Sequence, residues 1–162
     1  MIARHVKYLF LSVIFVLVQT QLMRLLTLEG ITPDILTIWI VYLALRDGQL
    51  AATLWGFSVG LMFDLVTGSF LGLSALSKTV AGFVAGYFFN ENKTSLTLGS
   101  YRFIVIVLIT SLIHNTIYFI VFTQGSGISL LSAIFQVGLA TTFYTATITL
   151  LPMFAFSRNR SV

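Results

Sequence analysis

Apolar segments long enough to cross a membrane follow one another along this 162-residue chain. A helix needs about 20 apolar residues to cross the hydrocarbon core of a bilayer, so six crossings would use about 120 residues. Hydrophobic residues make up 57% of the chain and charged residues 9%, whereas a soluble domain carries about 25% charged residues. We therefore expect an all-α membrane protein. Residues 1–162 should form a single integral membrane domain, with no room for a soluble catalytic module.

Glycine, proline and polar residues divide the chain into six predicted transmembrane helices. The second is short, because about 14 residues cover roughly 21 Å at the rise of an α-helix. Thr32 suits its N-cap and Pro33 its first position. We expect the Pro33-Asp34 end to lie below the membrane surface, covered by protein. The predicted spans are about 7–28, 32–45, 49–66, 72–90, 102–123 and 129–154.

The distribution of Lys and Arg predicts the orientation of these spans. With the N-terminus in the cytoplasm, seven of the nine basic residues lie on the cytoplasmic side, and the outer loops near Gly30, Ser69 and Ser126 carry none. Cytoplasmic loops of membrane proteins are enriched in Lys and Arg, which favours six spans with both termini inside. The seven residues are Arg4, Lys7, Arg46, Lys93, Arg102, Arg158 and Arg160. We expect the four at the cytoplasmic ends, Arg4, Lys7, Arg158 and Arg160, to anchor to anionic lipid and not to a protein. We expect no nucleic-acid partner.

Two charges inside the third and fourth spans, Asp64 and Lys78, are the sharpest signal in the sequence. A charge in a bilayer is costly, so each should face protein or water and find a partner. Each also continues a stripe of glycines spaced four residues apart, which lets helices pack closely. We predict an Asp64–Lys78 ion pair inside an antiparallel hairpin. This pair would either fix the register of the two helices or shape a partner surface or a polar cavity. The glycines are Gly56 and Gly60 in the third span and Gly82 and Gly86 in the fourth.

Other polar residues within the spans have simpler explanations. Arg24 lies near the outer end of the first span, where its side chain can reach the headgroups or contact Asp34 or Asp64. Asp34 is favoured by the dipole at the start of the second helix. His114 and Asn115 lie in the middle of the fifth span, and we expect them to form hydrogen bonds between helices.

The sequence offers little support for an enzyme. It has no cysteine, which excludes disulfides, iron–sulfur clusters and cysteine nucleophiles. It has no G-x-S-x-G elbow, no H-E-x-x-H motif and no Walker loop. No second histidine or nearby carboxylate joins His114 in a metal site. We expect no catalytic residues, no metal and no cofactor.

A series of motifs runs from Thr32 to Gly86. It opens with P-D-I-L and continues with G-x-x-x-G-L-x-x-D from Gly56 to Asp64 and G-x-x-x-G-L-x-A-L from Gly68 to Leu76. Together these motifs resemble the family of the rod shape-determining protein MreD. The resemblance covers about a third of the chain, and the remainder is similar in length, span count and hydropathy.

This resemblance implies a non-enzymatic adaptor in the bacterial cytoplasmic (inner) membrane. Its direct partner would be MreC, in the cell-elongation complex that includes MreB, RodA and a class B penicillin-binding transpeptidase. That complex supports rod shape and lateral peptidoglycan synthesis. We expect the partner to contact the outer half of the protein, around the polar cluster of Arg24, Asp34, Asp64 and Lys78.

The family is also similar in architecture to the S components of ECF vitamin transporters, which bind small molecules. This similarity supplies an alternative function, a substrate-binding subunit of a transporter with an outward-facing site. S components commonly carry an A-x-x-x-A-type motif in the first helix for docking the energising subunit. Here residues 9–28 contain neither Ala nor Gly, which argues against that mode of docking.

Overall fold

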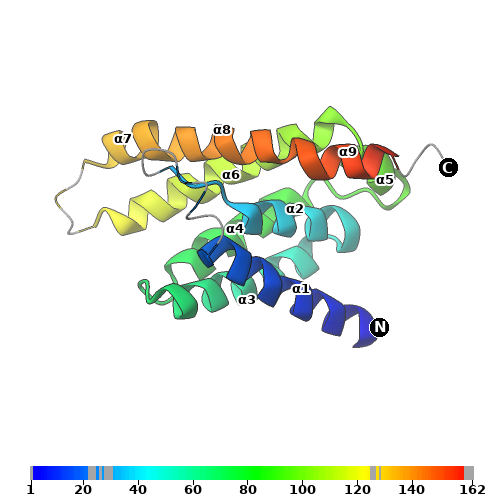
Figure 1. Ribbon diagram of the computed structural model, residues 1–162, viewed down its shortest axis with the longest axis horizontal. Coiled ribbons are helices and arrows are strands. Elements are labelled where there is room, and N and C mark those ends of the chain that lie inside the picture. Colours follow the sequence, from blue (N-terminus) through cyan, green and yellow to red (C-terminus); the bar gives the residue numbers. More distant parts are fainter. Residues whose placement is uncertain are drawn as a thin grey trace.

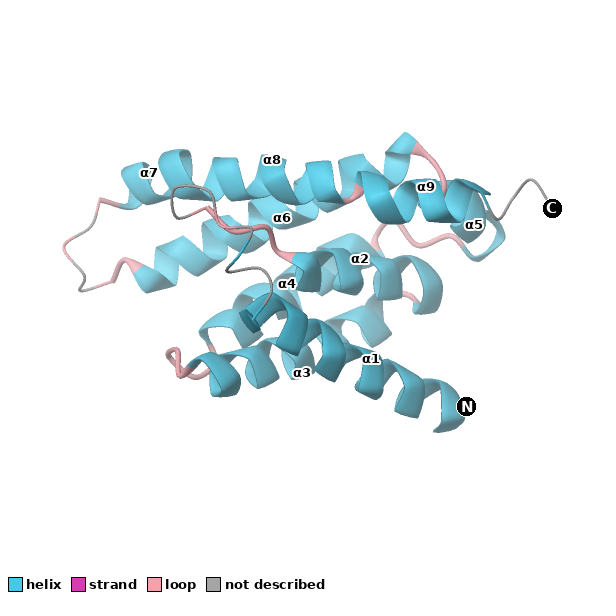
Figure 2. Cartoon of the chain, viewed as in Figure 1, coloured by secondary structure: helices cyan, strands magenta, loops and turns pink. Residues whose placement is uncertain are grey.

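The computed structural model describes residues 2–21, 25, 27, 31–124, 127 and 129–158. Within these residues the chain forms helices and no strand (Figures 1 and 2), which confirms the all-α prediction. The elements are α1 (Ile2–Gln21), α2 (Ile35–Asp47), α3 (Gln49–Thr67), α4 (Leu73–Gly86), η2 (Glu91–Lys93), α5 (Thr94–Leu98), α6 (Tyr101–Phe122), α7 (Leu130–Ser132), η3 (Ala133–Gly138), α8 (Leu139–Ile148) and α9 (Leu150–Arg158).

Each of the six predicted apolar segments contains a helix. Three helices among the described residues are long and apolar enough to cross a membrane: Gln49–Thr67, Tyr101–Phe122 and Leu130–Arg158. The last of these runs through α7, η3, α8 and α9, and η3 is a π-helical stretch. The apolar helix Leu73–Gly86 is shorter.

The helices run roughly along the long axis of the molecule (Figure 1). α1 begins and α9 ends at the same end of the bundle, where α5 and the α2–α3 junction also lie. The α3–α4 turn and the facing ends of α6 and α7 lie at the opposite end. The bundle therefore has a terminal end, which holds the start of α1 and the end of α9, and a turn end opposite to it.

α3 and α4 form a closely packed hairpin. A Cβ atom built on Gly56 would lie 2.3 Å from the Lys78 carbonyl oxygen, and one on Gly60 would lie 2.5 Å from Ala75 Cα. From the other side, Cβ atoms on Gly82 and Gly86 would lie 2.4 Å from the Ala52 carbonyl oxygen and 2.3 Å from Gln49 Cα. Real Cβ atoms cannot approach backbone this closely, so only glycine at these four positions permits this contact between the two helices.

The short helix α2 lies at the centre of the bundle. Nine of its 13 residues are buried, from Leu36 to Leu45, and Pro33 and Asp34 before it are buried as well. This burial confirms that protein covers the Pro33-Asp34 end. Because lipid cannot satisfy free backbone groups, a helix that starts inside the bundle needs polar partners from its neighbours.

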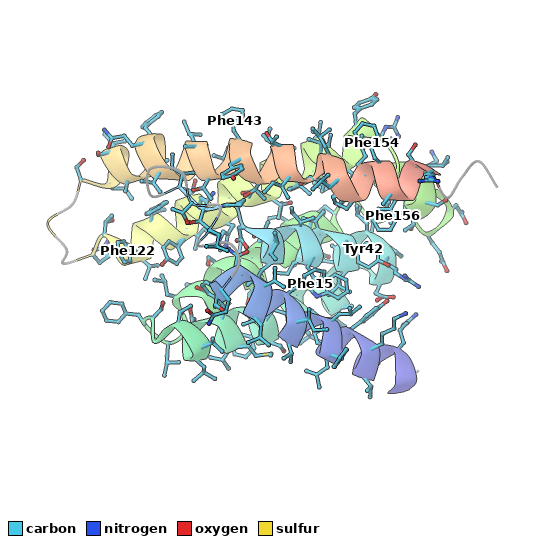
Figure 3. All side chains as sticks on the ribbon, viewed as in Figure 1. Phe15, Tyr42, Phe122, Phe143, Phe154 and Phe156 are labelled. Atoms are coloured by element: carbon cyan, nitrogen blue, oxygen red, sulfur yellow. The ribbon has the colours of Figure 1, made fainter. Side chains whose placement is uncertain are left out.

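Aromatic side chains divide between the core and the outer surface. Phe143 and Phe154 point away from the bundle (Figure 3), and both are more than 60% exposed. Phe103, at the start of α6, is instead completely buried in a cluster with Ile38, Val41 and Leu98. An apolar exposed surface of this kind suits contact with lipid tails or with partner helices.

Candidate functional site

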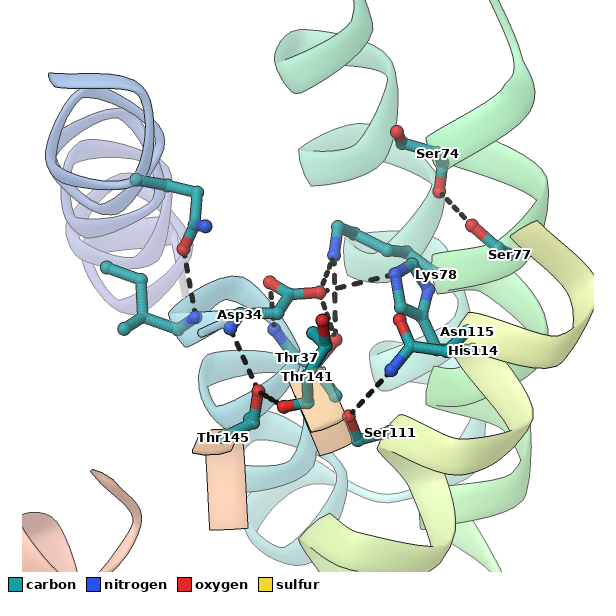
Figure 4. A network of polar contacts seen from close by, with 12 residues as sticks. Asp34, Thr37, Ser74, Ser77, Lys78, Ser111, His114, Asn115, Thr141 and Thr145 are labelled. Carbon is teal, nitrogen blue, oxygen red and sulfur yellow. Dashed lines mark hydrogen bonds and ion pairs between the residues drawn. The ribbon is translucent and has the colours of Figure 1, made fainter. Parts of the chain in front are cut away.

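Asp34 and Lys78 form an ion pair at the centre of the bundle (Figure 4). Lys78 Nζ, on α4, lies 2.5 Å from Asp34 Oδ2 at the start of α2. Asp34 is the N-cap of α2, and its carboxylate accepts hydrogen bonds from Thr37 N at 3.1 Å and Thr37 Oγ1 at 2.7 Å. Only 9% of Asp34 and 2% of Lys78 is exposed. One carboxylate thus caps a helix and neutralises a buried ammonium group.

The predicted ion pair between Asp64 and Lys78 is wrong. The fully buried Asp64 carboxylate accepts hydrogen bonds from the backbone amides of Gly72 at 3.0 Å, Ser74 at 3.1 Å and Ala75 at 3.3 Å. The first amides of a helix have no partner within the helix and favour a negative charge. Gly72 is the N-cap of α4 and has no side chain to cap it, so Asp64 from α3 does so.

His114 and Asn115 connect α6 to the same region, as expected for hydrogen-bonding residues between helices. His114 Nε2 lies 3.3 Å from Asp34 Oδ2. Asn115 Nδ2 donates to the Gly138 carbonyl at 3.1 Å and to Thr142 Oγ1 at 2.9 Å. Gly138 ends the π-helical stretch η3, so Asn115 joins α6 to the irregular part of the last long helix.

The backbone at the start of α2 also forms hydrogen bonds with side chains from α1 and α8. The Asp34 amide donates to Thr145 Oγ1 on α8 at 2.9 Å. The Ile35 amide donates to Gln19 Oε1 on α1 at 2.9 Å, and Gln19 Nε2 donates to the Pro33 carbonyl at 2.9 Å. The segment around Asp34 therefore contacts α1, α4, α6 and α8. We call Gln19, Asp34, Thr37, Lys78, His114 and Thr145 the Asp34 cluster.

A pocket of about 280 Å³ lies beside this cluster. Gln19, Asp34, Lys78 and His114 line it, together with Tyr118 from α6 and Thr141 from α8. Drug-sized ligands occupy pockets of about 300–1,000 Å³, so this space suits a single side chain or a small polar molecule. Among the described residues, no group of three or more His, Cys, Asp and Glu could hold a metal ion.

The structure brings together only part of the predicted polar cluster. Asp34 and Lys78 meet, Asp64 caps the neighbouring helix, and Arg24 lies outside the described residues. The sequence placed Asp34 in this polar cluster, as a helix cap and a possible contact of Arg24, but it did not predict its ion pair with Lys78 or its contacts with Thr37 and Thr145. Thr37 lies one turn after Asp34, so the spacing itself was a signal for it. Thr145 is 111 residues from Asp34, and no local pattern connects the two.

Comparison with known proteins identifies the family. The family model of rod shape-determining protein MreD matches residues 2–160 of the 162-residue chain. No curated protein and no solved structure gives a significant match. The match extends far beyond the motifs between Thr32 and Gly86, across almost the whole sequence. This chain belongs to the MreD family of rod shape-determining proteins.

Proposed function

We propose that this protein is a non-enzymatic adaptor of the bacterial cell-elongation complex and that it binds an MreC-like membrane protein. The family supports a role in rod-shape determination. The observation that carries the adaptor role is the Asp34 cluster, which links α1, α2, α4, α6 and α8 at one point. A rigid membrane body of this kind can present a fixed surface to a partner. Through MreC it would act indirectly on MreB, RodA and a class B penicillin-binding transpeptidase, and so on lateral peptidoglycan synthesis.

The proposed topology is six spans in the cytoplasmic (inner) membrane with both termini inside. The common location of the start of α1 and the end of α9 supports it (Figure 1). The basic residues support it too, because Arg4, Arg46 and Arg158 belong to helix ends at the terminal end of the bundle. The turn end would then face the periplasm.

The pocket beside the Asp34 cluster is the proposed contact point for the partner. Its lining comes from the last third of α1, from Thr32 and Asp34 just before α2, from α3 and α4, and from the second half of α6. In the proposed topology, these segments support a position toward the periplasmic side. Asp64 and Lys78 are themselves buried, so a partner would meet this region through the pocket. A polar side chain from the membrane-proximal part of an MreC-like protein fits the size and polarity of the pocket.

Filling the pocket tests this contact. Thr141→Trp places a large side chain in the pocket wall, and we expect it to abolish co-purification with the MreC-like partner while membrane levels stay normal. Thr147→Trp on the same helix is the control, because Thr147 is exposed and does not line the pocket. Equal co-purification of both variants would place the interface elsewhere.

Depletion in the native cell tests the broader function. We expect rods to round up as lateral wall synthesis loses its organisation. Normal rods together with a new vitamin requirement would instead support the alternative of a transporter S-component-like subunit. A tight vitamin ligand of the purified protein would support the same alternative.

A further inference from the structure

A second, larger cavity lies at the other end of the molecule and plays no part in the proposed partner contact. It is a groove of about 470 Å³ between α1 on one side and α8 and α9 on the other, with α2 as its floor. Phe15, Tyr42 and Phe156 lie along it, between α1 and α9 (Figure 3). We call it the α1–α9 groove.

A row of aromatic contacts runs from α1 across the α2 floor of the α1–α9 groove to α9, and we call this row the aromatic wall. The Tyr42 ring stacks on Trp39 at a centroid distance of 5.3 Å and on Phe156 at 5.5 Å. The Phe15 ring contacts Trp39 in a tilted arrangement at a centroid distance of 5.1 Å. These contacts join α1, α2 and α9, so the wall is held in place while its surface stays open to a flexible apolar ligand.

The terminal end of the groove is positively charged, whereas the aromatic wall is apolar. Arg4, Lys7 and Arg46 line the groove there, and all three are exposed. Arg4 Nη1 lies 3.4 Å from Asp47 Oδ1, so one carboxylate offsets one of three positive charges. The groove thus ends in an excess of two positive charges.

Arg46 is fixed in this position by Tyr42. Its Nη1 donates a hydrogen bond to the Tyr42 hydroxyl, and its guanidinium lies 5.8 Å from the centroid of the Tyr42 ring. The hydrogen bond to Tyr42 raises the pKa of the Arg46 guanidinium above its usual value. The same tyrosine therefore belongs to the aromatic wall and orients a cation at its end.

The dimensions of the groove match one leaflet of a bilayer. The groove-lining residues run from Arg4 to Phe15 along α1 and from Arg46 back to Ile35 along α2, which is eleven helical steps in each case. At the rise of an α-helix this distance is about 16 Å. Half of a hydrocarbon core about 30 Å thick is about 15 Å. A chain lying in the groove with its charged end at the cations would reach the middle of the membrane.

We propose that the α1–α9 groove binds one anionic phospholipid of the cytoplasmic leaflet. Its phosphate lies at Arg4, Lys7 and Arg46, and an acyl chain lies along the aromatic wall. Basic pockets between membrane helices on the cytoplasmic side are suited to anionic headgroups. The assignment to this leaflet rests on the topology proposed above, whereas binding itself does not.

The charge of the groove argues against a partner helix as its occupant. The three cations Arg4, Lys7 and Arg46 would face the apolar surface of such a helix without a counter-charge. An acyl chain with a phosphate satisfies both parts of the groove.

Native mass spectrometry of the whole purified, delipidated chain tests this proposal. The probes are phosphatidylglycerol, zwitterionic phosphatidylethanolamine and free glycerol phosphate. We expect one molecule of phosphatidylglycerol to bind at least tenfold more tightly than phosphatidylethanolamine, and free glycerol phosphate not to bind. Equal binding of the two lipids, or tight binding of glycerol phosphate, would overturn the proposal.

Two sets of variants separate binding in the groove from a general attraction to anionic lipid. Replacing Arg4, Lys7 and Arg46 together by Gln should weaken phosphatidylglycerol binding about a hundredfold, because each basic side chain near anionic lipid contributes roughly a fivefold gain. Lys93→Gln with Arg102→Gln is the control, since neither residue lines the groove. A similar loss in both sets would indicate surface electrostatics only and would overturn the site.

The apolar part of the site has its own test. Leu11→Trp fills the groove and should reduce phosphatidylglycerol binding at least tenfold, although the three cations remain. Leu9→Trp is the control, because Leu9 is 49% exposed and lies outside the groove. If the triple variant fails to fold, Lys7→Gln alone, at an exposed position, replaces it in the binding measurement. Unchanged binding by Leu11→Trp would contradict a lipid occupant. A protein that is mainly dimeric, and that becomes a lipid-free monomer when Leu11→Trp fills the groove, would also contradict it, because a second copy of the chain would then occupy the groove.

Discussion

Lys78 Nζ and Asp34 Oδ2 lie 2.5 Å apart, although 44 residues separate them in the chain. This contact joins the middle of α4 to the first turn of α2 in the buried centre of the bundle. Asp34 Oδ2 also faces His114 Nε2 at 3.3 Å. The pair therefore connects the α3–α4 hairpin to the rest of the protein.

Removing one member of this pair should destabilise the protein strongly. Lys78→Met leaves a buried carboxylate without its counter-charge, and breaking a buried pair in this way costs about 3–5 kcal/mol. Asp34→Asn should behave similarly, because it leaves the ammonium group unpaired. Thermal unfolding in mild detergent measures the effect.

The double variant is the control for the pair. Asp34→Asn combined with Lys78→Met should be more stable than the sum of the two single changes predicts, because it removes both charges together. Additive losses would mean that the two side chains do not interact.

Asp64 should act independently of Lys78. Asp64→Ala removes the cap of α4 and should cost about 0.5–2 kcal/mol, the range for loss of a helix N-cap. Because Asp64 contacts the amides of Gly72, Ser74 and Ala75, its loss should add to that of Lys78→Met within about 0.5 kcal/mol. A coupling as large as that between Asp34 and Lys78 would favour an Asp64–Lys78 pair instead.

The glycine contact in the α3–α4 hairpin should not tolerate even one methyl group. Gly56→Ala would put a Cβ 2.3 Å from the Lys78 carbonyl oxygen, so the two backbones must separate. We expect a loss of about 1–3 kcal/mol, as for other overpacked cores. Ser58→Ala, an exposed change two residues further along α3, should stay within about 0.5 kcal/mol of the parent protein. Equal stability of the two variants would show that the hairpin can open without cost.

The link between α6 and the last long helix should have a smaller effect. Asn115→Ala removes the hydrogen bonds to Gly138 and Thr142. Hydrogen bonds between membrane helices contribute about 0.6 kcal/mol on average and up to about 1.7 kcal/mol, so the loss should fall in this range. Thr116→Val is the matched control, since the Thr116 hydroxyl donates to the Leu112 carbonyl of its own helix and, among the described residues, to no other helix. A larger loss for Thr116→Val, measured in the same unfolding assay, would contradict this assignment.

The helices and the hairpin of this protein could be predicted because their signals are local. Long apolar runs form helices in lipid, where every backbone group must be satisfied within the segment. Glycines spaced four residues apart share one helix face, and the short Thr67–Leu71 connection makes α3 and α4 neighbours. The burial of Pro33 and Asp34 also followed from a local fact, the short length of the second apolar segment.

The sequence by itself determined which charges had to be buried, and only the tertiary structure decided which of them meet. Asp64 and Lys78 lie at similar depths on adjacent helices, which favoured pairing them. The free amides at the start of α4 are the nearer partners of Asp64, because Gly72 has no side chain to cap that helix. Lys78 then reaches Asp34, which α2 places between α1, α4, α6 and α8. Ion pairs form between groups that are close in space. The long side chain of a lysine can reach several neighbouring helices, including ones that are far away in the sequence.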